Sequence, residues 1–372
     1  NDFFLEIPID LVPTLCTRPI KFLRFLDWCI LGAVGVVSME PAGSAMSDDA
    51  SLEERGVYFY VLQEMDDPLR YAVDLEAVKV YSQVPSETTA TRDDFSNKVA
   101  ERDVCCIFTN SSAELCDGAH IIPFSKGDEW FNLLVGSRPN NGEDVSGLSS
   151  INDIRNEMYL SSNVHKLFDK RKLVVLKETF TPNLILDTAD IPSRSSIGRD
   201  LKYGVKYSEK DRYTLQSLTS TDTIRDDIAN NLDAAFKLHS KKPKPSPLLL
   251  HYNYGVAAVI WWGKGESRLH ASNRPNIPRP TVPVPAPMGP RRVMHDRQVT
   301  RDKLEHARAE DVGSRGTGSA AGKSEQDTDR VYAEDFVLTL WASTVVARER
   351  REAEAKENAY RMERWQAGGL FA

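Results

Sequence analysis

The stretch Asp117–Phe124, which reads DGAHIIPF, places a histidine between a small residue and an apolar run that ends in proline. A single histidine beside two isoleucines is most often a core residue whose ring nitrogens are hydrogen-bonded. A chemical role for His120 therefore requires metal-binding or catalytic partners at suitable distances along the chain.

Two segments downstream supply such partners. Arg155–Leu160 (RNEMYL) is strand-like and carries Asn156, whereas Ser161–Lys170 (SSNVHKLFDK) is predicted to be helical. Eight residues separate Asn156 from His165, and Asp169 follows His165 by four, so the last two side chains share one helix face. This order predicts a hairpin packed on a helix, with a metal ion held between them.

Three segments carry a resemblance to a known family. Ala119–Phe124 (AHIIPF), Asn156 and Val164–Asp169 (VHKLFD) resemble the His-Asn-His motif of the HNH nucleases, the ββα-metal endonuclease family. In the type of HNH-domain protein found widely in fungi, a helix ending in Arg-Asp and a cysteine-rich strand precede the motif, and Phe95–Asp103 and Cys105–Thr109 match them. The motif covers about a fifth of the chain, residues 105–177, and a weaker likeness extends over residues 95–265.

The resemblance implies a metal-dependent endonuclease that hydrolyses phosphodiester bonds of nucleic acid, with DNA as the expected substrate. His120 is the expected general base, because a neutral imidazole can take a proton from water near physiological pH. His165 is the expected ligand of a divalent Mg²⁺, Mn²⁺ or Zn²⁺ ion, and Asp169 either binds that ion, orients His165 or pairs with a neighbouring lysine. Asn156 is expected to hold the metal-side loop or the catalytic histidine in place through amide hydrogen bonds.

One position departs from the family pattern. Many HNH sequences carry Asp, Glu or His immediately before the catalytic histidine, where it also contacts the metal, but this chain has Ala119. The nearest acid, Asp117, would point to the opposite face of a strand from His120. Either the metal has fewer protein ligands or His120 is itself a ligand. The alternatives are a catalytically inactive protein of this fold that acts as a scaffold or binds nucleic acid, and a zinc module built from Cys105, Cys116 and His120.

Five basic residues on and near the predicted metal helix are candidates for contacts with nucleic-acid phosphates: Lys126, Lys166, Lys170, Arg171 and Lys172. Such contacts would depend on salt and would not read base sequence. The whole chain has a net charge of −7 and a pI near 5.6, which argues against a protein coated in positive charge but allows a local basic groove.

Length and composition limit the class of protein. The 372 residues, 41% of them hydrophobic, can form two domains or one domain with extensions. The five cysteines are odd in number and have no regular spacing, which, with no convincing secretory signal, indicates reduced thiols and an intracellular protein. The absence of a C-x-x-C pair argues against a zinc knuckle. Trp28–Met39 is a run of 12 uncharged residues, shorter than the ~20 apolar residues of a membrane span, and is expected to be a short buried element. No membrane association is expected.

The expected fold class is α+β, with a ββα-metal core, flanking strands and helices, a Pro-rich disordered linker and a long C-terminal helix. The expected divisions are an N-terminal segment at residues 1–91, an HNH nuclease-like domain at 92–265, the linker at 266–330 and the C-terminal helix at 331–372. Within the last of these, Ala333–Trp365 has an apolar stripe at helical spacing, which would pack on the core, bind a partner protein or mediate self-association.

The hydrophobic pattern predicts the elements around the site. Strands are expected at Val57–Leu62, Ala72–Tyr81, Cys105–Thr109, Glu157–Leu160, Leu173–Leu176 and Leu184–Leu186. Helices are expected at Arg92–Asp103, from Ser161 or Ser162 through Lys170 with a serine hydroxyl as the cap, and around Thr223–Ser240. Ser125–Asn152 is expected to be a long loop, and Leu248–Trp262 to pack back onto the domain.

Overall fold

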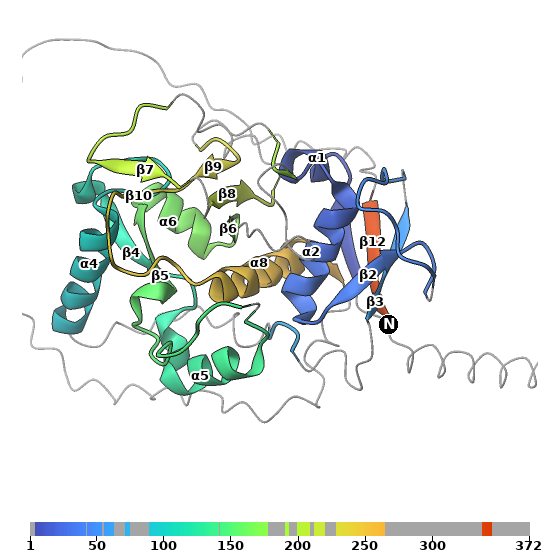
Figure 1. The fold of residues 1–372 in the computed structure, drawn as a ribbon, viewed down its shortest axis with the longest axis horizontal. Coiled ribbons are helices and arrows are strands. Elements are labelled where there is room, and N and C mark those ends of the chain that lie inside the picture. Colours follow the sequence, from blue (N-terminus) through green and yellow to red (C-terminus); the bar gives the residue numbers. More distant parts are fainter. Residues whose placement is uncertain are drawn as a thin grey trace, which may run out of the picture. The chain divides into compact units, whose positions relative to one another are not determined.

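The structure is a computed structural model, and it describes residues 4–41, 43–53, 56–62, 71–74, 89–140, 142–177, 190–192, 199–208, 212–219, 228–264 and 337–343. These residues form a mixed fold of helices and strands, consistent with the α+β class (Figure 1). The strand predicted at Leu184–Leu186, the linker predicted at 266–330 and most of the segment after it lie outside the described residues.

One sheet combines strands from distant parts of the chain. Its order is β11 (Gly263–Lys264), β1 (Phe4–Pro8), β12 (Val337–Ser343), β3 (Val57–Leu62) and β2 (Gly35–Ser38). β12 pairs antiparallel with β1 and parallel with β3, so it lies between them. The predicted strand Val57–Leu62 is confirmed.

The helix predicted at residues 331–372 is wrong for Val337–Ser343, the part of that segment which the structure describes. Helical spacing of its apolar residues suggested the helix, but the run VLTLWAS is a short, mostly apolar stretch in which only Thr339 and Ser343 are polar. A run this short does not distinguish a helix from a buried strand by its pattern alone. The partners β1 and β3, far away in the sequence, supply the backbone hydrogen bonds that make it a strand.

Helix α8 (Pro247–Trp262) lies between α2 (Pro19–Leu31) and strand β6 (Leu173–Lys177), and contacts both (Figure 1). Nearly every side chain of α8 is buried, which confirms that this segment packs back onto the rest of the chain. Gly255 of α8 lies against the backbone of Cys29 in α2, where an added β-carbon would collide with the carbonyl oxygen. The two helices can therefore approach closely only with glycine at this position.

The N-terminal elements account for the apolar run at Trp28–Met39. The short helix α1 (Val12–Leu15) precedes α2, and α2 ends at Gly32, whose φ of 65° is the left-handed conformation that favours glycine. Trp28–Met39 is thus the end of α2 followed by β2, both largely buried. None of the helices in the described ranges combines the length and the apolar character that crossing a bilayer requires.

A hairpin and the helix after it occupy the centre of the described chain. β4 (Cys116–His120) pairs antiparallel with β5 (Glu157–Ser161), and α6 (Ser162–Asp169) follows β5 directly. Helix α4 (Thr89–Asp103) also contacts both strands. The predicted strand at Glu157–Leu160 and the predicted helices around Arg92–Asp103 and after Ser161 are confirmed, with bounds that differ by a few residues.

The remaining elements flank the hairpin. A three-stranded sheet has the order β6, β8 (Tyr213–Ser217) and β9 (Leu232–Asp233), and a two-stranded sheet joins β7 (Val205–Tyr207) to β10 (Ala235–Lys237). The others are the helix α5 (Gly127–Ser137) and the single turns η1 (Ala113–Leu115), η2 (Phe124–Lys126) and η3 (Ile154–Asn156). The strand predicted at Leu173–Leu176 is confirmed as β6, one residue longer.

Several local predictions are wrong. Ser125–Asn152 is not one long loop, because most of its first half forms α5, anchored by buried Trp130, Phe131 and Leu134. Of the helix predicted around Thr223–Ser240, the described residues form β9 and β10, because strands β8 and β7 pair with them.

Two other segments near the hairpin differ from expectation. Cys105–Thr109 is a turn, held by the Cys106 amide, which donates to the Ser111 carbonyl at 3.0 Å. The predicted serine cap of α6 is absent in this part of the structure, since the Ser161 hydroxyl caps no amide and the Ser162 hydroxyl lies 3.3 Å from Asp117. Of the strand predicted at Ala72–Tyr81, only residues 72–74 are described, and they are not a strand.

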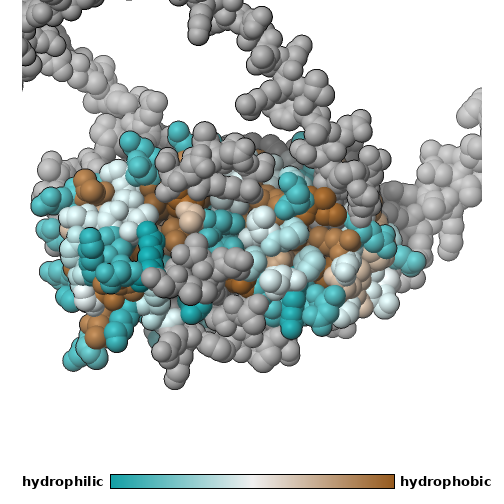
Figure 2. All heavy atoms as spheres, turned by 90° about the horizontal axis from the view of Figure 1, so that it is seen from above, coloured by the Kyte–Doolittle hydropathy of each residue, from teal (hydrophilic) through white to brown (hydrophobic). Residues whose placement is uncertain are grey.

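The surface seen from above is a mixture of small apolar patches and polar residues (Figure 2). Large apolar side chains that are exposed, such as Leu115 and Tyr203, come from separate elements. Scattered exposure of this kind is ordinary for a folded protein.

His251 on α8 predicts that the protein loses stability in mild acid. Its ring is buried, packs edge-on against Trp28 with centroids 5.0 Å apart, and places Nε2 3.1 Å from the Lys177 carbonyl oxygen. Burial lowers the pKa of His251 to about 4 from the ordinary 6.5. The unfolded chain therefore binds a proton below pH 6.5 while the folded chain resists it, so stability is full above pH 6.5 and falls as the pH drops towards 4.

The expected loss from this group is on the order of 3 kcal/mol across that window. Urea denaturation of wild type and His251→Phe at a series of pH values measures it, and the variant should lose less stability on acidification. His239→Phe, at an exposed loop position, is the matched control and should keep the wild-type pH dependence. Parallel curves for wild type and His251→Phe would contradict the prediction.

Candidate active site

Asn156 fixes the backbone that follows His120. The Asn156 side chain is fully buried, and its Oδ1 accepts a hydrogen bond from the Ile122 amide at 2.8 Å. Its Nδ2 donates to the carbonyl oxygens of Ile122 at 3.0 Å and Ile151 at 2.8 Å. One side chain thus ties the end of β4 to the loop before η3.

Replacement of Asn156 is expected to destabilise the protein. Asn156→Ala would leave three buried backbone groups without their partner, at a total of about 3 kcal/mol, since each lost buried partner costs about 1–3 kcal/mol and relaxation recovers part. Urea denaturation measures the change. Asn163→Ala, at an exposed position in α6, is the matched control and should change stability by less than about 0.5 kcal/mol. Equal losses in the two variants would contradict this account.

His120 ends β4 and is half-buried. Its register partner across the hairpin is Glu157, its Nε2 lies 3.2 Å from Asn152 Oδ1, and its ring centroid lies 5.9 Å from that of Phe124. Burial is the main cause that lowers the pKa of His120 to about 4; the Asn152 contact opposes this effect, and the nearby charge of His165 adds a smaller lowering. The imidazole is therefore neutral at physiological pH, the state that a base requires.

Asn152 is a contact that the sequence did not reveal. It lies in the segment expected to be a loop, with no fixed spacing from His120, so no periodicity identifies it. The sequence offered only the residue type of position 152 as a clue, since the amide of an asparagine is a neutral group that can orient an imidazole.

His165 and Asp169 lie one turn apart on α6, as predicted. His165 Nε2 is 3.5 Å from Asp169 Oδ2, and both side chains are partly exposed. His165 is also near enough to His120 for its charge to influence that imidazole. The donors are an imidazole nitrogen and a carboxylate oxygen, a combination that suits divalent transition metals.

The structure limits how many protein ligands a metal ion could have. Across the described ranges, no three His, Cys, Asp or Glu side chains converge on one point. Ala119, the position that departs from the family pattern, is completely buried opposite Met158 and offers no donor. A metal held by His165 and Asp169 would therefore take most of its other ligands from water or substrate.

The alternative of a zinc module is not supported by this geometry. The Cys105 sulfur accepts a hydrogen bond from Asn110 Nδ2 at 3.3 Å, and the Cys116 sulfur donates to the Ser112 carbonyl at 3.2 Å. Cys116 and His120 stand at opposite ends of β4. The sulfurs thus have local hydrogen-bond partners, and the described residues contain no three-ligand cluster.

The five basic candidates divide by burial. Lys166 and Lys170 are exposed on or just after α6, and Lys172 is half-buried. Lys126 and Arg171 are buried, which corrects the expectation that they form a surface for nucleic acid. The sequence could not show this, because the covering residues come from α5 and α8, distant in the chain.

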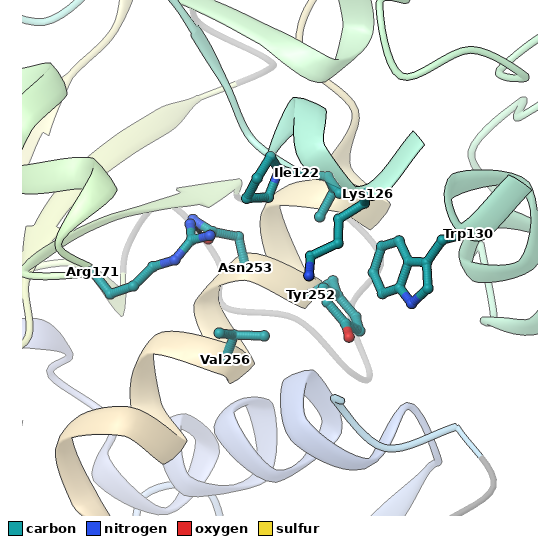
Figure 3. Close-up of a pocket in the computed structure, with 8 residues that line it drawn as sticks. Ile122, Lys126, Trp130, Arg171, Tyr252, Asn253 and Val256 are labelled. Carbon is teal, nitrogen blue, oxygen red and sulfur yellow. Dashed lines mark hydrogen bonds between the residues drawn. The ribbon is translucent and has the colours of Figure 1, made fainter. Parts of the chain in front are cut away.

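Lys126 and Arg171 instead face a tight pocket with Trp130, Tyr252 and Asn253 (Figure 3). The Arg171 guanidinium donates to Asn253 Oδ1, and its carbonyl oxygen accepts from Trp261 Nε1 at 2.7 Å. Burial lowers the pKa of Lys126. The side chains fill the pocket so closely that no water-sized space remains, so we assign these two cations to the packing between α6 and α8.

Arg102 at the end of α4 braces the start of β5. It is 1% exposed and forms a two-pronged ion pair with Asp103, with Nε–Oδ1 and Nη2–Oδ2 distances of 2.7 Å. The same guanidinium donates to the carbonyl oxygens of Ile154 at 2.7 Å and Glu157 at 2.8 Å. This side chain therefore holds the strand residue that lies opposite His120.

Glu157 carries a neutral carboxyl group. The side chain is completely buried, and neither carboxyl oxygen has a hydrogen-bond partner in the described part of the chain. Burial raises the pKa of Glu157 to about 10, and Arg102 opposes that effect only in part. Glu157 thus stays protonated at physiological pH and adds no negative charge beside His120.

Comparison with known proteins identifies one segment. Residues 105–176 match the model of the HNH endonuclease family, HNH_2. This segment contains the hairpin, α6 and nearly all of β6, so it includes every residue of the predicted metal and catalytic set. No curated protein and no solved structure matches the chain. At the level of the family, the matched segment indicates a nuclease domain that acts on nucleic acid.

Proposed function

We propose that the chain is a metal-dependent endonuclease that hydrolyses phosphodiester bonds of DNA. The observation that carries the proposal is the coincidence of the family match at residues 105–176 with a hairpin and helix in the same segment, on and beside which lie His120, Asn156 and His165, the residues that resemble a His-Asn-His motif. The His120 ring is neutral at physiological pH and has Asn152 as a polar support, so it meets the first requirement of a general base.

In this proposal the protein residues divide the work. His120 takes a proton from the attacking water, with the ring oriented by the Asn152 amide. Asn156 keeps the backbone after His120 in position, and Arg102 holds the opposite strand. A divalent cation bound by His165 and Asp169 would supply Lewis-acid stabilisation of charge on the phosphate and on the leaving 3′ oxygen.

A plasmid-nicking assay tests the proposed function. Purified full-length protein should cut plasmid DNA with Mg²⁺, Mn²⁺ or Zn²⁺ and should not cut in EDTA, and His165→Ala should abolish the metal-dependent cleavage. Cleavage by His165→Ala at the wild-type rate would contradict the assignment of His165 as a metal ligand. Absence of cleavage by wild type with every one of these ions would contradict the proposed activity.

A protein that binds nucleic acid without cutting it is the second candidate function. Two observations favour it: Ala119 offers no metal donor, and a histidine with a pKa near 4 is a weak base. The same plasmid assay decides between the two functions when DNA binding is measured beside it. Tight binding in EDTA with no cleavage in any metal supports the second candidate.

Three lysines on and just after α6, of which Lys166 and Lys170 are exposed and Lys172 is half-buried, predict a salt-dependent contribution to binding. The triple variant Lys166→Gln, Lys170→Gln, Lys172→Gln should bind duplex DNA more weakly, and the slope of log K against log salt should fall by about 0.9 for each lost phosphate contact. Fluorescence anisotropy at several salt concentrations measures the slope. An unchanged slope would show that these lysines contact no phosphate.

A further inference from the structure

A groove with no role in the proposed chemistry opens beside the site. It has a volume of about 510 Å³ and is lined by Lys98, Asn152, Asp153, Ile154, Arg155, Lys242 and Pro243. Its walls come from α4, from the loop and turn before β5, and from the connector between β10 and α8. Lys98 and Lys242 lie outside the segment that matches the nuclease family.

The charge of the groove is mostly positive. Three of its lining side chains are cations and one, Asp153, is a carboxylate. Arg155 is held by Asp153, with its Nη2 3.0 Å from the carboxylate, and also donates to the Ser146 carbonyl. Anchored in this way, Arg155 presents its charge with little side-chain entropy left to lose on binding.

Lys242 is held against α4. Its ammonium pairs with Glu101 and lies 3.4 Å from the Lys98 carbonyl oxygen. The pair is solvent-accessible, with 34% of the Lys242 side chain exposed and 69% of the Glu101 side chain. A phosphate that entered the groove would compete with Glu101 for the same ammonium, and such exposed pairs are weak enough to exchange.

The groove reaches the candidate base through Asn152. This residue lines the groove and also lies 3.2 Å, through Oδ1, from His120 Nε2. A strand whose scissile phosphate lay at His120 would therefore have its neighbouring phosphates at the mouth of the groove.

We propose that this groove binds the sugar-phosphate backbone of the substrate strand beside the cleavage position, with Lys98, Arg155 and Lys242 as its phosphate contacts. The inference rests on the proposed function and extends it, because it gives residues outside the family segment a part in holding the substrate. It also explains how a chain with a net charge of −7 attracts a polyanion: the positive field is local to the groove.

Binding of the full-length protein to a fluorescent DNA duplex in EDTA tests the inference without cleavage. The double variant Lys98→Gln, Lys242→Gln should bind about 10-fold more weakly at low salt, and its salt slope should fall by about 2. Lys264→Gln is the matched control, since Lys264 is also a partly exposed lysine paired with a glutamate, Glu6, but lies in β11. It should bind like wild type.

Glu101→Gln supplies the opposite change. It removes the acid that competes for Lys242, so the variant should bind DNA more tightly than wild type at low salt and show a steeper salt slope. If the Lys242–Glu101 pair has only a structural role, Glu101→Gln and Lys242→Gln should each lower the free energy of unfolding and leave the affinity for DNA unchanged.

The outcomes separate this inference from the proposed function. If the double variant and Lys264→Gln both bind like wild type, the groove is not a phosphate site, even where the wild type cuts DNA. The other case is a wild type that cuts no DNA, with weaker DNA binding by the double variant and tighter binding by Glu101→Gln. That result supports the groove as a phosphate site and contradicts the proposed nuclease activity.

Discussion

His120→Ala is expected to slow metal-dependent DNA cleavage by about 10²–10⁴-fold, the range that a positioned general base contributes. The reason is that two neighbours of the ring cannot take the proton in its stead: Asn152 is an amide, and Glu157 is buried and uncharged. Removal of the ring should leave the fold intact, because His120 lies at the end of β4 and Asn156 fixes the backbone that follows.

The measurement is the single-turnover rate with saturating protein and a fixed metal concentration. His239→Ala, an exposed histidine in a loop outside the site, is the matched control and should cut at the wild-type rate. Urea denaturation of both variants checks that neither is unfolded. A His120→Ala protein that cuts as fast as His239→Ala would show that another group accepts the proton.

Arg102→Met is expected to lower the free energy of unfolding by about 3–5 kcal/mol, the cost of breaking a buried ion pair by removing one partner. Asp103 would be left as a completely buried carboxylate, and the carbonyl oxygens of Ile154 and Glu157 would lose their donor. Because Glu157 lies opposite His120, cleavage should fall as well, to a degree set by how far β5 shifts.

Urea denaturation at neutral pH measures this loss. Asn97→Ala, at an exposed position on the same helix, should change stability by less than about 0.5 kcal/mol. The double variant Arg102→Met, Asp103→Leu should lose less than the single one, since it leaves no unpaired charge behind. A single variant as stable as Asn97→Ala would mean that the ion pair contributes nothing to the fold.

The central hairpin and its helix could be predicted from sequence because their residues are close in the chain. β4, β5 and α6 all lie within residues 116–169, and the four-residue spacing of His165 and Asp169 follows the period of a helix. The hydrogen bonds of the Asn156 side chain also follow from the residue type, since a buried asparagine amide needs partners for both its N–H donors and its oxygen acceptor.

The failures share a different cause. β12, β9 and β10 have patterns that fit either a helix or a strand, and distant strands decide the matter by supplying hydrogen bonds. Lys126 and Arg171 were expected on the surface because charged residues are usually exposed, but α8 covers them. The partner of Arg171 on that helix, Asn253, lies more than 80 positions further along the chain. Asn152 and the groove depend on loop paths, which no periodicity encodes.

The position of α8 has a practical consequence for how short a folded fragment of this chain can be made. Strand β6, which the family segment includes almost entirely, is buried on α8, and Arg171 takes its partner Asn253 from that helix. A fragment trimmed to residues 105–176 would also lack Arg102 and Asp103, so it would expose apolar strand surface and leave polar groups unmatched. Minimal versions for assay or crystallisation should therefore retain α2, α4 and α8, three helices that lie outside the matched segment.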